Sequence, residues 1–274
     1  MRLFKVNPEK CKRDDICVFE CPAQVIERVG TDAVPTPAVR ADEDCIGCGH
    51  CVTVCPHAAF EHRELHPDQC PPIQKEQSVG PERLEHFLRA RRSIRAYKEK
   101  PVEREKLAKL IDIARFAPTG SNKQTPEWRV VHSPGKVQDL SGMVIEWMQS
   151  VIERKPDVAA ELELQALVDM HASGYDIICR QAPHAIVVHA PQDTGTPTED
   201  GMIAMTYLEL AAFSLGLGAC WAGYLNFAVN KWPPLKEALL IPEDHASIAA
   251  ILLGYPKYKY HRLPLRNDPK IAWV

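Results

Sequence analysis

The feature that most constrains this chain lies near its N-terminus, where residues 45–56 carry four cysteines spaced Cys-x2-Cys-x2-Cys-x3-Cys-Pro. The four are Cys45, Cys48, Cys51 and Cys55. A short loop with this spacing brings three thiolates to three corners of an iron–sulfur cube, and the fourth cysteine, before proline, binds a neighbouring cluster. The motif predicts an electron-transfer module with two clusters. A structural zinc site is the alternative, but such sites usually take two Cys-x2-Cys pairs with a longer spacer.

A partner run lies upstream, in residues 11–22. It repeats the first, third and fourth cysteines of the later motif, but an aspartate stands at the second position. The paired runs resemble the bacterial two-cluster ferredoxin module. That resemblance implies one complete 4Fe-4S cluster held by Cys21, Cys45, Cys48 and Cys51, and a second cluster held by Cys11, Cys17, Cys55 and, in the remaining position, Asp14.

Because of this aspartate, the sequence allows either three or four iron atoms in the second cluster. A carboxylate is a harder ligand than a thiolate and binds iron more weakly in such a site. Asp14 is therefore either the ligand of a labile corner or a solvated acid beside a three-iron cluster. We expect this cluster to be 4Fe-4S or 3Fe-4S.

Length and composition predict two domains in a protein that binds small molecules. The 274 residues exceed the cysteine module, so we expect a ferredoxin domain at 1–66, a Pro-rich linker at 67–81 and a second domain at 82–274. A net charge of −3 favours neither nucleic acid nor a membrane surface as a partner. Eight of the ten cysteines precede residue 71 and most have cluster spacing, which indicates a reducing compartment. With no apolar run of roughly 20 residues, a cytoplasmic protein is expected.

Two polar segments of the second domain suggest an anion-binding and a ring-binding site. The first is the basic run at 91–97, after a helix predicted from about residue 81. The second is the loop at 118–124, which follows a predicted helix over 102–116 and precedes a predicted strand over 128–132. Arginines suit a phosphate, and a loop of small residues and amides suits a polar ring.

The region from about 82 to 266 resembles the nitroreductase family of flavoproteins. Five elements carry this resemblance in order: the R-x-S-x-[RK] segment, the A-P-[ST]-x-x-N-x-Q loop, an apolar strand at 182–188, a central helix at 202–215 followed by a glycine turn, and a closing strand at 248–256. The resemblance implies an α+β protein: a nitroreductase-like α/β sandwich with a four- or five-stranded sheet, joined to the ferredoxin-like iron–sulfur domain. It also implies FMN as cofactor and a homodimer.

The same resemblance assigns cofactor contacts residue by residue. The segment expected at the phosphate contains Arg91, Arg92, Ser93 and Arg95, with Arg262 from the late basic stretch, where Lys259 and Arg266 compete with it. The loop expected at the ribityl chain or ring contains Pro118, Thr119, Gly120, Asn122 and Gln124. The turn expected along the isoalloxazine contains Trp221, Ala222 and Gly223. A catalytic acid–base pair is not identifiable.

Several conspicuous residues carry a structural interpretation. His184 and Trp147 are expected in the core, as are Cys179 and Cys220. In the family that this region resembles, insertions such as 161–170 cover the flavin, so this stretch is expected to influence substrate choice. A dinucleotide fold is excluded at 216–221, because Trp221 takes the place of the third glycine and the turn follows a predicted helix where that motif must follow a strand.

The predicted function is an FMN-dependent oxidoreductase of nitroreductase type. We expect the clusters to relay single electrons to or from FMN, which would reduce or oxidise a small organic substrate such as a nitro or quinone compound. NAD(P)H or a ferredoxin could supply the electrons. The alternatives are an NAD(P)H-fed flavin/ferredoxin reductase that sends electrons outward, and a non-catalytic electron carrier or redox sensor.

Overall fold

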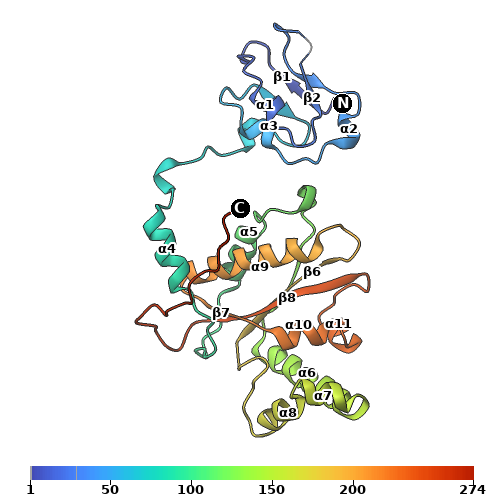
Figure 1. Ribbon diagram of the computed structural model, residues 1–274, viewed down its shortest axis with the longest axis vertical. Helices are drawn as coiled ribbons and strands as arrows, with labels where there is room; N and C mark the ends of the chain where they lie inside the picture. The colour runs from blue at the N-terminus through green and yellow to red at the C-terminus, as the bar shows by residue number, and fades with distance from the viewer. Residues whose placement is uncertain (1, 29) are drawn as a thin grey trace. The chain divides into compact units, whose positions relative to one another are not determined.

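The computed structural model describes residues 2–28 and 30–274 (Figure 1). Internal contacts divide the chain into two compact units. The first comprises residues 1–78 with 121–123, and the second comprises 79–120 and 124–274. Within the described residues, none of the helices has the length and apolarity needed to cross a membrane.

The first unit has little regular structure and a small core. Strand β1 (Phe4–Val6) pairs antiparallel with β4 (Phe60–His62), and β2 (Ile26–Glu27) pairs antiparallel with β3 (Thr36–Pro37). Its short helices are α1 (Ile16–Phe19), α2 (Ala41–Asp44) and α3 (His50–Thr53). The Phe4 and Phe60 rings lie 4.4 Å apart and form the centre of its apolar core, against which most of the motif cysteines pack.

The connection after this unit contains two short 3-10 turns, η1 (Pro67–Gln69) and η2 (Lys75–Gln77). Helix α4 (Pro81–Ala90) then opens the second unit, at the residue the sequence predicted. Pro81 suits the first helical position, because the amide it lacks would have had no partner there.

The second unit is built on a four-stranded sheet, the smaller of the two sizes expected. Its strands are β5 (Glu127–Val131), β6 (His184–Pro191), β7 (Gly218–Trp221) and β8 (His245–Gly254). They lie in the order β5-β6-β8-β7, and every neighbouring pair is antiparallel. Ile94 donates its amide to the Ala219 carbonyl at 2.8 Å, so the basic run lies along the outer edge of β7.

Helices cover both faces of this sheet (Figure 1). Ile186 and Ile251 contribute to the core cluster shared with α5 (Arg104–Ala114) and α9 (Pro197–Ser214). Their neighbours Val187 and Ala250 contribute to the opposite cluster. The helices on that side are α6 (Pro134–Arg154), α7 (Pro156–Glu161), α8 (Leu164–Ala172), α10 (Gly223–Val229) and α11 (Pro233–Ala238). The alternation explains why β6 and β8 are apolar almost throughout, since both of their faces are buried.

Two sequence predictions differ in detail from the structure. The glycine turn expected over 216–223 includes strand β7, because Cys220 and Trp221 pair with β8 as β-favouring residues do. Helix α9 begins at Pro197, whereas the sequence predicted a central helix from residue 202, and one of its sides faces outward. Ile203 and Tyr207, on the outward side, remain 38% and 40% exposed.

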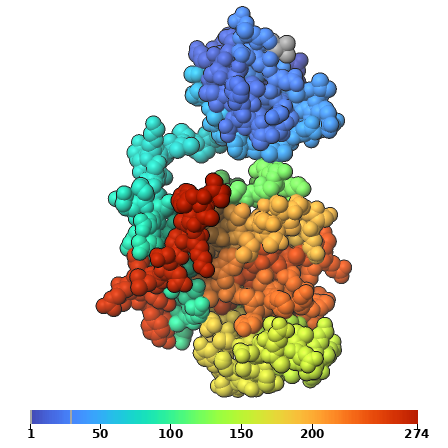
Figure 2. Space-filling view, in the orientation of Figure 1, coloured from blue at the N-terminus to red at the C-terminus, as the bar shows by residue number. Residues whose placement is uncertain are grey.

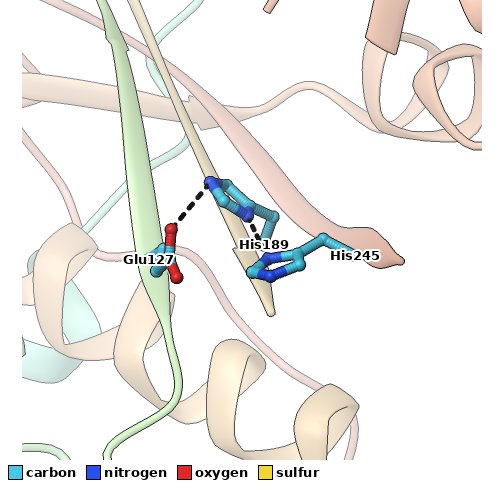
Figure 3. Close-up of side chains that lie close together, drawn as sticks. All are labelled: Glu127, His189 and His245. Atoms are coloured by element: carbon cyan, nitrogen blue, oxygen red, sulfur yellow. Dashed lines mark hydrogen bonds and ion pairs between the residues drawn. The ribbon is translucent and has the colours of Figure 1, made fainter. Parts of the chain in front are cut away.

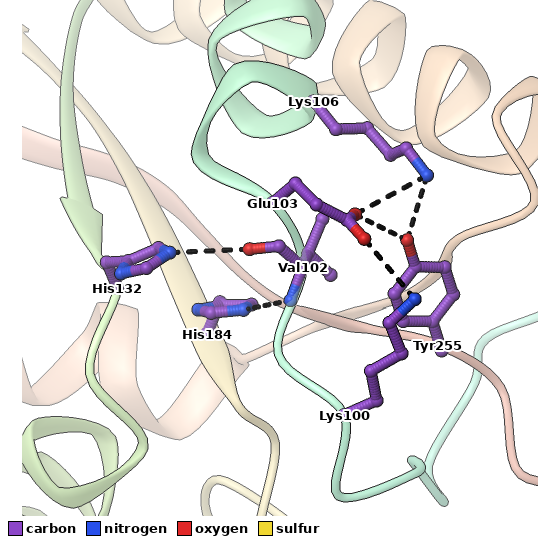
Figure 4. Close-up of polar contacts among 7 residues, drawn as sticks. All are labelled: Lys100, Val102, Glu103, Lys106, His132, His184 and Tyr255. Carbon is purple, nitrogen blue, oxygen red and sulfur yellow. Dashed lines mark hydrogen bonds and ion pairs between the residues drawn. The ribbon is translucent and has the colours of Figure 1, made fainter.

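His184 has the structural role expected from the sequence (Figure 4). It is fully buried at the start of β6, and its Nε2 accepts a hydrogen bond from the Val102 amide at 2.8 Å. The His132 ring stacks on it at 4.8 Å. Burial, and then the neighbouring His132, lower the pKa of His184 below its ordinary 6.5. The neutral ring therefore attaches the start of α5 to the sheet. Close by, Tyr255 donates to Glu103 at 2.6 Å.

This contact predicts a pH-dependent stability. Because folding lowers the pKa of His184, the unfolded chain takes up a proton first as the pH falls. The contribution is complete above pH 6.5 and is lost progressively below it. In anaerobic urea unfolding, His184→Gln should cost about 1–3 kcal/mol near neutral pH. The difference from the natural protein should shrink as the pH falls towards about 5.5.

His86→Gln is the matched control, because His86 is an exposed histidine of the same unit. It should retain the pH profile of the natural protein. An unchanged pH profile in His184→Gln would contradict the assignment.

Candidate redox site

The first unit brings the expected cluster residues together in two separate cavities. One cavity is lined by thiols from both motifs, namely Cys21, Cys45, Cys48 and Cys51. The other is lined by Cys11, Asp14, Cys17 and Cys55. In each cavity, one thiol comes from the cysteine before proline of the opposite run, which is the crossed arrangement that the ferredoxin resemblance implies.

The two loops use the same backbone turns with different residues. In the later motif Gly47 and Gly49 have φ of 61° and 75°, a conformation that glycine adopts without strain. At the equivalent positions of the earlier motif, Arg13 and Asp15 have φ of 57° and 58°. These side chains make the left-handed turn less favourable. Arg28 pairs with Asp15 at 2.6 Å and supports the turn.

The chemistry of the lining side chains fits bound iron. Burial, and then the neighbouring Cys48, raise the pKa of Cys51 to about 12. Burial, and then Cys55, raise the pKa of Cys17 to about 11. Closely grouped thiols of this kind become thiolates when a metal ion compensates their charge. Asp14 is exposed, lines the second cavity, and accepts a long 3.4 Å hydrogen bond from the Ile16 amide.

His62 contacts the first cavity through a hydrogen bond to the sulfur of Cys45, an expected ligand. Its Nδ1 accepts the Glu64 amide at 3.1 Å, so in the neutral ring the proton is on Nε2. That Nε2 lies 3.7 Å from Cys45 Sγ and donates to it. Hydrogen bonds to cluster sulfurs stabilise the more negative, reduced state and raise the potential. Sequence reasoning missed His62, because it lies outside both motifs.

In the second unit, a buried carboxylate joins two of the expected flavin contacts. Glu209, on α9, accepts Arg91 Nη1 on one oxygen at 2.9 Å and Trp221 Nε1 on the other at 3.0 Å. Its side chain is only 9% exposed. Ser93 forms a bridge with Ala219 on β7. The phosphate segment and the end of β7 are thereby held side by side.

A cavity of about 400 Å³ opens beside this end of β7. Three of its lining residues were expected at the isoalloxazine, namely Trp221, Ala222 and Gly223. Arg95 and Arg180 supply its positive charge. Its apolar wall is formed by residues that include Trp147, Leu162, Leu164 and Phe227. The expectation that the 161–170 stretch influences substrate choice is consistent with Leu162 and Leu164 in this wall.

Arg180 reaches the cavity from an unusual turn. Arg180 and Gln181 both have φ of 53°, in the left-handed region that non-glycine residues rarely adopt. Asp176 stabilises the turn, accepting hydrogen bonds from the Cys179 and Gln181 amides, both at 2.8 Å, and from Ser141 at 2.6 Å. Although burial raises the pKa of Asp176, these hydrogen bonds lower it overall. Strain of this kind gathers at functional sites.

The structure places the other expected contacts apart from this cavity. In the 118–124 loop, Gly120 donates its amide to Asp200 at 2.9 Å, and a Cβ at Gly120 would overlap Thr196. The Thr119 hydroxyl accepts the Gln124 amide at 3.0 Å. The loop residues Pro118, Thr119, Gly120 and Gln124 are not among the described residues that line the cavity, and Asn122 groups with the first unit.

The remaining basic candidates lie towards the surface. The Arg92 guanidinium lies 5.9 Å from the centre of the Tyr260 ring. Arg262 is exposed in the C-terminal segment, like Lys259 and Arg266.

Sequence reasoning missed Glu209 and Arg180 for different reasons. Glu209 is an acid within an apolar helix, and its spacing from Arg91 and Trp221 along the chain carries no recognisable pattern. An acid that close to the centre of a buried helix was nevertheless a signal, because such residues are almost never buried unpaired. Arg180 lies in a turn whose geometry depends on Asp176 and is not apparent from its neighbours.

Comparison with known proteins agrees with these observations. The model of the "Nitroreductase family" matches residues 88–255, and that of the "4Fe-4S dicluster domain" matches residues 9–60. A protein of Methanothermobacter thermautotrophicus that carries the name NADH dehydrogenase/NAD(P)H nitroreductase is 27% identical over 62% of this chain and 75% of its own length. One of Archaeoglobus fulgidus with the same name is 26% identical over 62% and 84%.

A solved structure supports the fold. A Bacteroides fragilis nitroreductase with bound FMN superposes with a TM-score of 0.57 at 20% identity, covering 72% of this chain and all of that one. The expected fold class and the expected family are confirmed, because the family match extends over more than half of the chain. The expected oxidoreductase type is confirmed with them. This chain therefore belongs to the nitroreductase family and carries a 4Fe-4S dicluster domain at its N-terminal end.

Proposed function

We propose that this protein is an iron–sulfur flavoprotein that passes electrons between two ferredoxin-type clusters and FMN, and that it reduces a small organic substrate such as a nitro or quinone compound. The observation that carries the proposal is the grouping of the eight candidate ligands into two cavities within a chain that belongs to a flavin-binding family. The clusters supply one-electron steps, and FMN supplies two-electron chemistry.

The residues of the first unit would hold the clusters unequally. Four thiolates would bind the first cluster, and the hydrogen bond from His62 to Cys45 would raise its potential. Three thiolates and the Asp14 carboxylate would bind the second, and we propose that Asp14 ligates a labile fourth iron. The corner at Asp14 would be the one from which iron is lost, because the carboxylate is exposed and a weaker ligand.

The second unit supports FMN through charge and shape. Arg91, oriented by Glu209, and Ser93 would bind the phosphate, for which a guanidinium is suited. Trp221, Ala222 and Gly223 would lie along the ring, at the cavity that also contains Arg95 and Arg180. Arg262, Thr119 and Asn122 remain proposed contacts that would require the exposed tail and loop to fold over the cofactor.

The same cavity would bind the substrate. Its apolar wall would exclude water from the ring and pack against an aromatic substrate. Arg180 would stabilise the negative charge that develops on a nitro or quinone oxygen, since a charged donor in a dry site acts strongly. Protons would come from solvent at the open side.

We also propose a homodimer. The outward side of α9 exposes apolar Ile203 and Tyr207, and α4 exposes Leu84 and Leu88, each 46% exposed. The C-terminal segment, drawn in dark red, lies on the outside of the second unit and exposes Trp273 (Figure 2). A second copy would cover these surfaces, because exposed apolar surface commonly marks a protein–protein contact.

A second candidate function concerns the donor. The two curated relatives are named for NADH and NAD(P)H, which favours a nicotinamide as the source of electrons. In that case FMN would receive hydride, and the clusters would pass electrons outward.

The test is anaerobic purification followed by quantification of iron, sulfide and flavin, and then stepwise reduction. We expect one FMN and seven or eight irons per chain. With NADPH alone, bleaching of the clusters would favour the outward direction. Bleaching with reduced ferredoxin, followed by oxidation with a nitroaromatic or quinone, would support the proposed direction. A protein with zinc and without flavin would contradict both.

Arg91→Ala and Arg92→Ala form a matched pair for the phosphate contact. Arg91 is held beside β7 by Glu209, whereas Arg92 stacks near Tyr260 at the surface. Loss of a charge-assisted hydrogen bond costs about 1.5–3 kcal/mol. FMN should therefore bind roughly 10- to 100-fold more weakly to Arg91→Ala and nearly normally to Arg92→Ala, as measured by fluorescence titration of flavin-depleted protein. Equal losses would contradict the assignment.

Asp14→Cys tests the weak corner of the second cluster. The variant completes the cysteine spacing, so it should retain eight irons after mild oxidation. The natural protein should lose about one iron and show a 3Fe-type EPR signal, because a carboxylate binds iron more weakly than a thiolate. Glu9→Cys, an added thiol at an exposed position of the same unit, should behave like the natural protein. Retention of all iron by the natural protein would show that the corner is not labile.

A further inference from the structure

Two histidines and a glutamate converge at the end of the sheet where β8 begins (Figure 3). Glu127 and His189 are direct cross-strand partners on β5 and β6. His245 opens β8, six residues before Ile251, which pairs with Trp221. The cluster is therefore separate from the cavity at the end of β7.

A local irregularity brings the histidines onto the same side. The pairing of β6 with β8 shifts between Val188 and His189, so His189 lies opposite Ser247. Residues two apart on a strand share a face, and His245 therefore lies diagonally across from His189. Bulges of this kind re-aim side chains and recur beside functional sites.

The distances resemble those of a metal site before the ion enters. One nitrogen of each histidine and one carboxylate oxygen of Glu127 lie within 4.8 Å of one another. His189 Nε2 is 3.9 Å from Glu127 Oε2, too long for a hydrogen bond. Ligand bonds of about 2.0–2.2 Å place two donors on one ion roughly 3–3.5 Å apart. A contraction of less than about 1 Å between these two atoms would close the site.

The buried nitrogen of His189 is the second, independent observation. His189 is fully buried, and its Nδ1 shares a proton with His245 Nδ1 at 2.8 Å. Its Nε2 has no hydrogen-bond partner among the described residues and points to the carboxylate. An unsatisfied buried polar atom is costly, and an ion between Nε2 and the carboxylate would satisfy it.

We propose that Glu127, His189 and His245 bind one divalent transition-metal ion, with Zn²⁺ as the best match and water in the remaining position. Binding of both rings would replace the hydrogen bond between the two Nδ1 atoms, because that bond leaves only one of the two neutral imidazoles with a lone pair for the ion. Two imidazoles and one carboxylate are a ligand set that zinc accepts with an open position. Glu127 is half-exposed, so the ion can enter from solvent.

Neighbouring cationic side chains would compete with the ion for Glu127, so we expect the ion to exchange with solvent. Arg129 Nη1 lies 3.9 Å from Glu127 Oε2 and competes for it, although Arg129 Nε is held by the Leu240 carbonyl at 3.0 Å. Lys236 is nearby and donates to the Glu243 carbonyl at 2.6 Å. The bound ion would connect β5, β6 and β8 at their shared end, and so would stabilise the second unit without contacting the cavity at the end of β7.

The test uses the holoprotein with its clusters and FMN in place. Zinc is added anaerobically by equilibrium dialysis, and zinc and iron are measured together per chain. Zinc K-edge X-ray absorption then reports the ligands without interference from iron. We expect one zinc per chain with nitrogen and oxygen ligands at about 2.0–2.1 Å. Thermal unfolding should shift upwards with zinc, because the ion binds only the folded protein.

Glu127→Gln is the decisive variant, because its side chain is half-exposed and the substitution preserves shape. It should weaken zinc binding at least tenfold and abolish the thermal shift. His245→Gln should do the same, and Glu243→Gln, a neighbouring exposed acid outside the set, should bind zinc as the natural protein does. Absence of bound zinc in the natural protein, equal binding in Glu127→Gln, or sulfur ligands at about 2.3 Å would overturn the proposal.

Discussion

The pairing of β6 with β8 is the interaction on which the second unit depends. Both strands are buried on both faces, so residues such as Val187 and Ile186 connect two separate helical layers into one domain. The flanking strands β5 and β7 then present their ends to solvent. The β7 edge of this sheet carries Trp221 and the cavity beside it, whereas the Glu127, His189 and His245 cluster is formed by β5, β6 and β8.

The first unit is stabilised in a different way. It is too small to bury a large apolar core, and few of its side chains are fully enclosed. Most of the motif cysteines pack against that core, so binding of clusters would contribute folding energy as well as redox chemistry. The left-handed turns at Gly47 and Gly49, and at Arg13 and Asp15, are the local cost of bringing thiols from distant residues together.

In the second unit, the arginines of the candidate site are positioned by carboxylates that lie outside the recognised sequence motifs. Glu209 orients Arg91 and Trp221 together, and Asp176 holds the turn that directs Arg180 into the cavity. Each carboxylate is at least partly buried and accepts more than one hydrogen bond, which makes its geometry well defined. Positioning of this kind allows the family fold to be retained while the chemistry of the cavity varies.

The sequence by itself determined the two cysteine runs, the family, a sheet of four or five strands and the buried role of His184, because these depend on short local patterns or on an ordered series of them. It located α4, α5 and the strands β5, β6 and β8 to within a few residues, but placed the start of α9 several residues late and read β7 as a turn. Only the tertiary structure decided the contacts of Glu209, the direction of Arg180 and the convergence of Glu127, His189 and His245. The convergence of the two histidines depends on strand register and on a bulge between strands whose residues are more than fifty positions apart, and no local propensity encodes such a pairing.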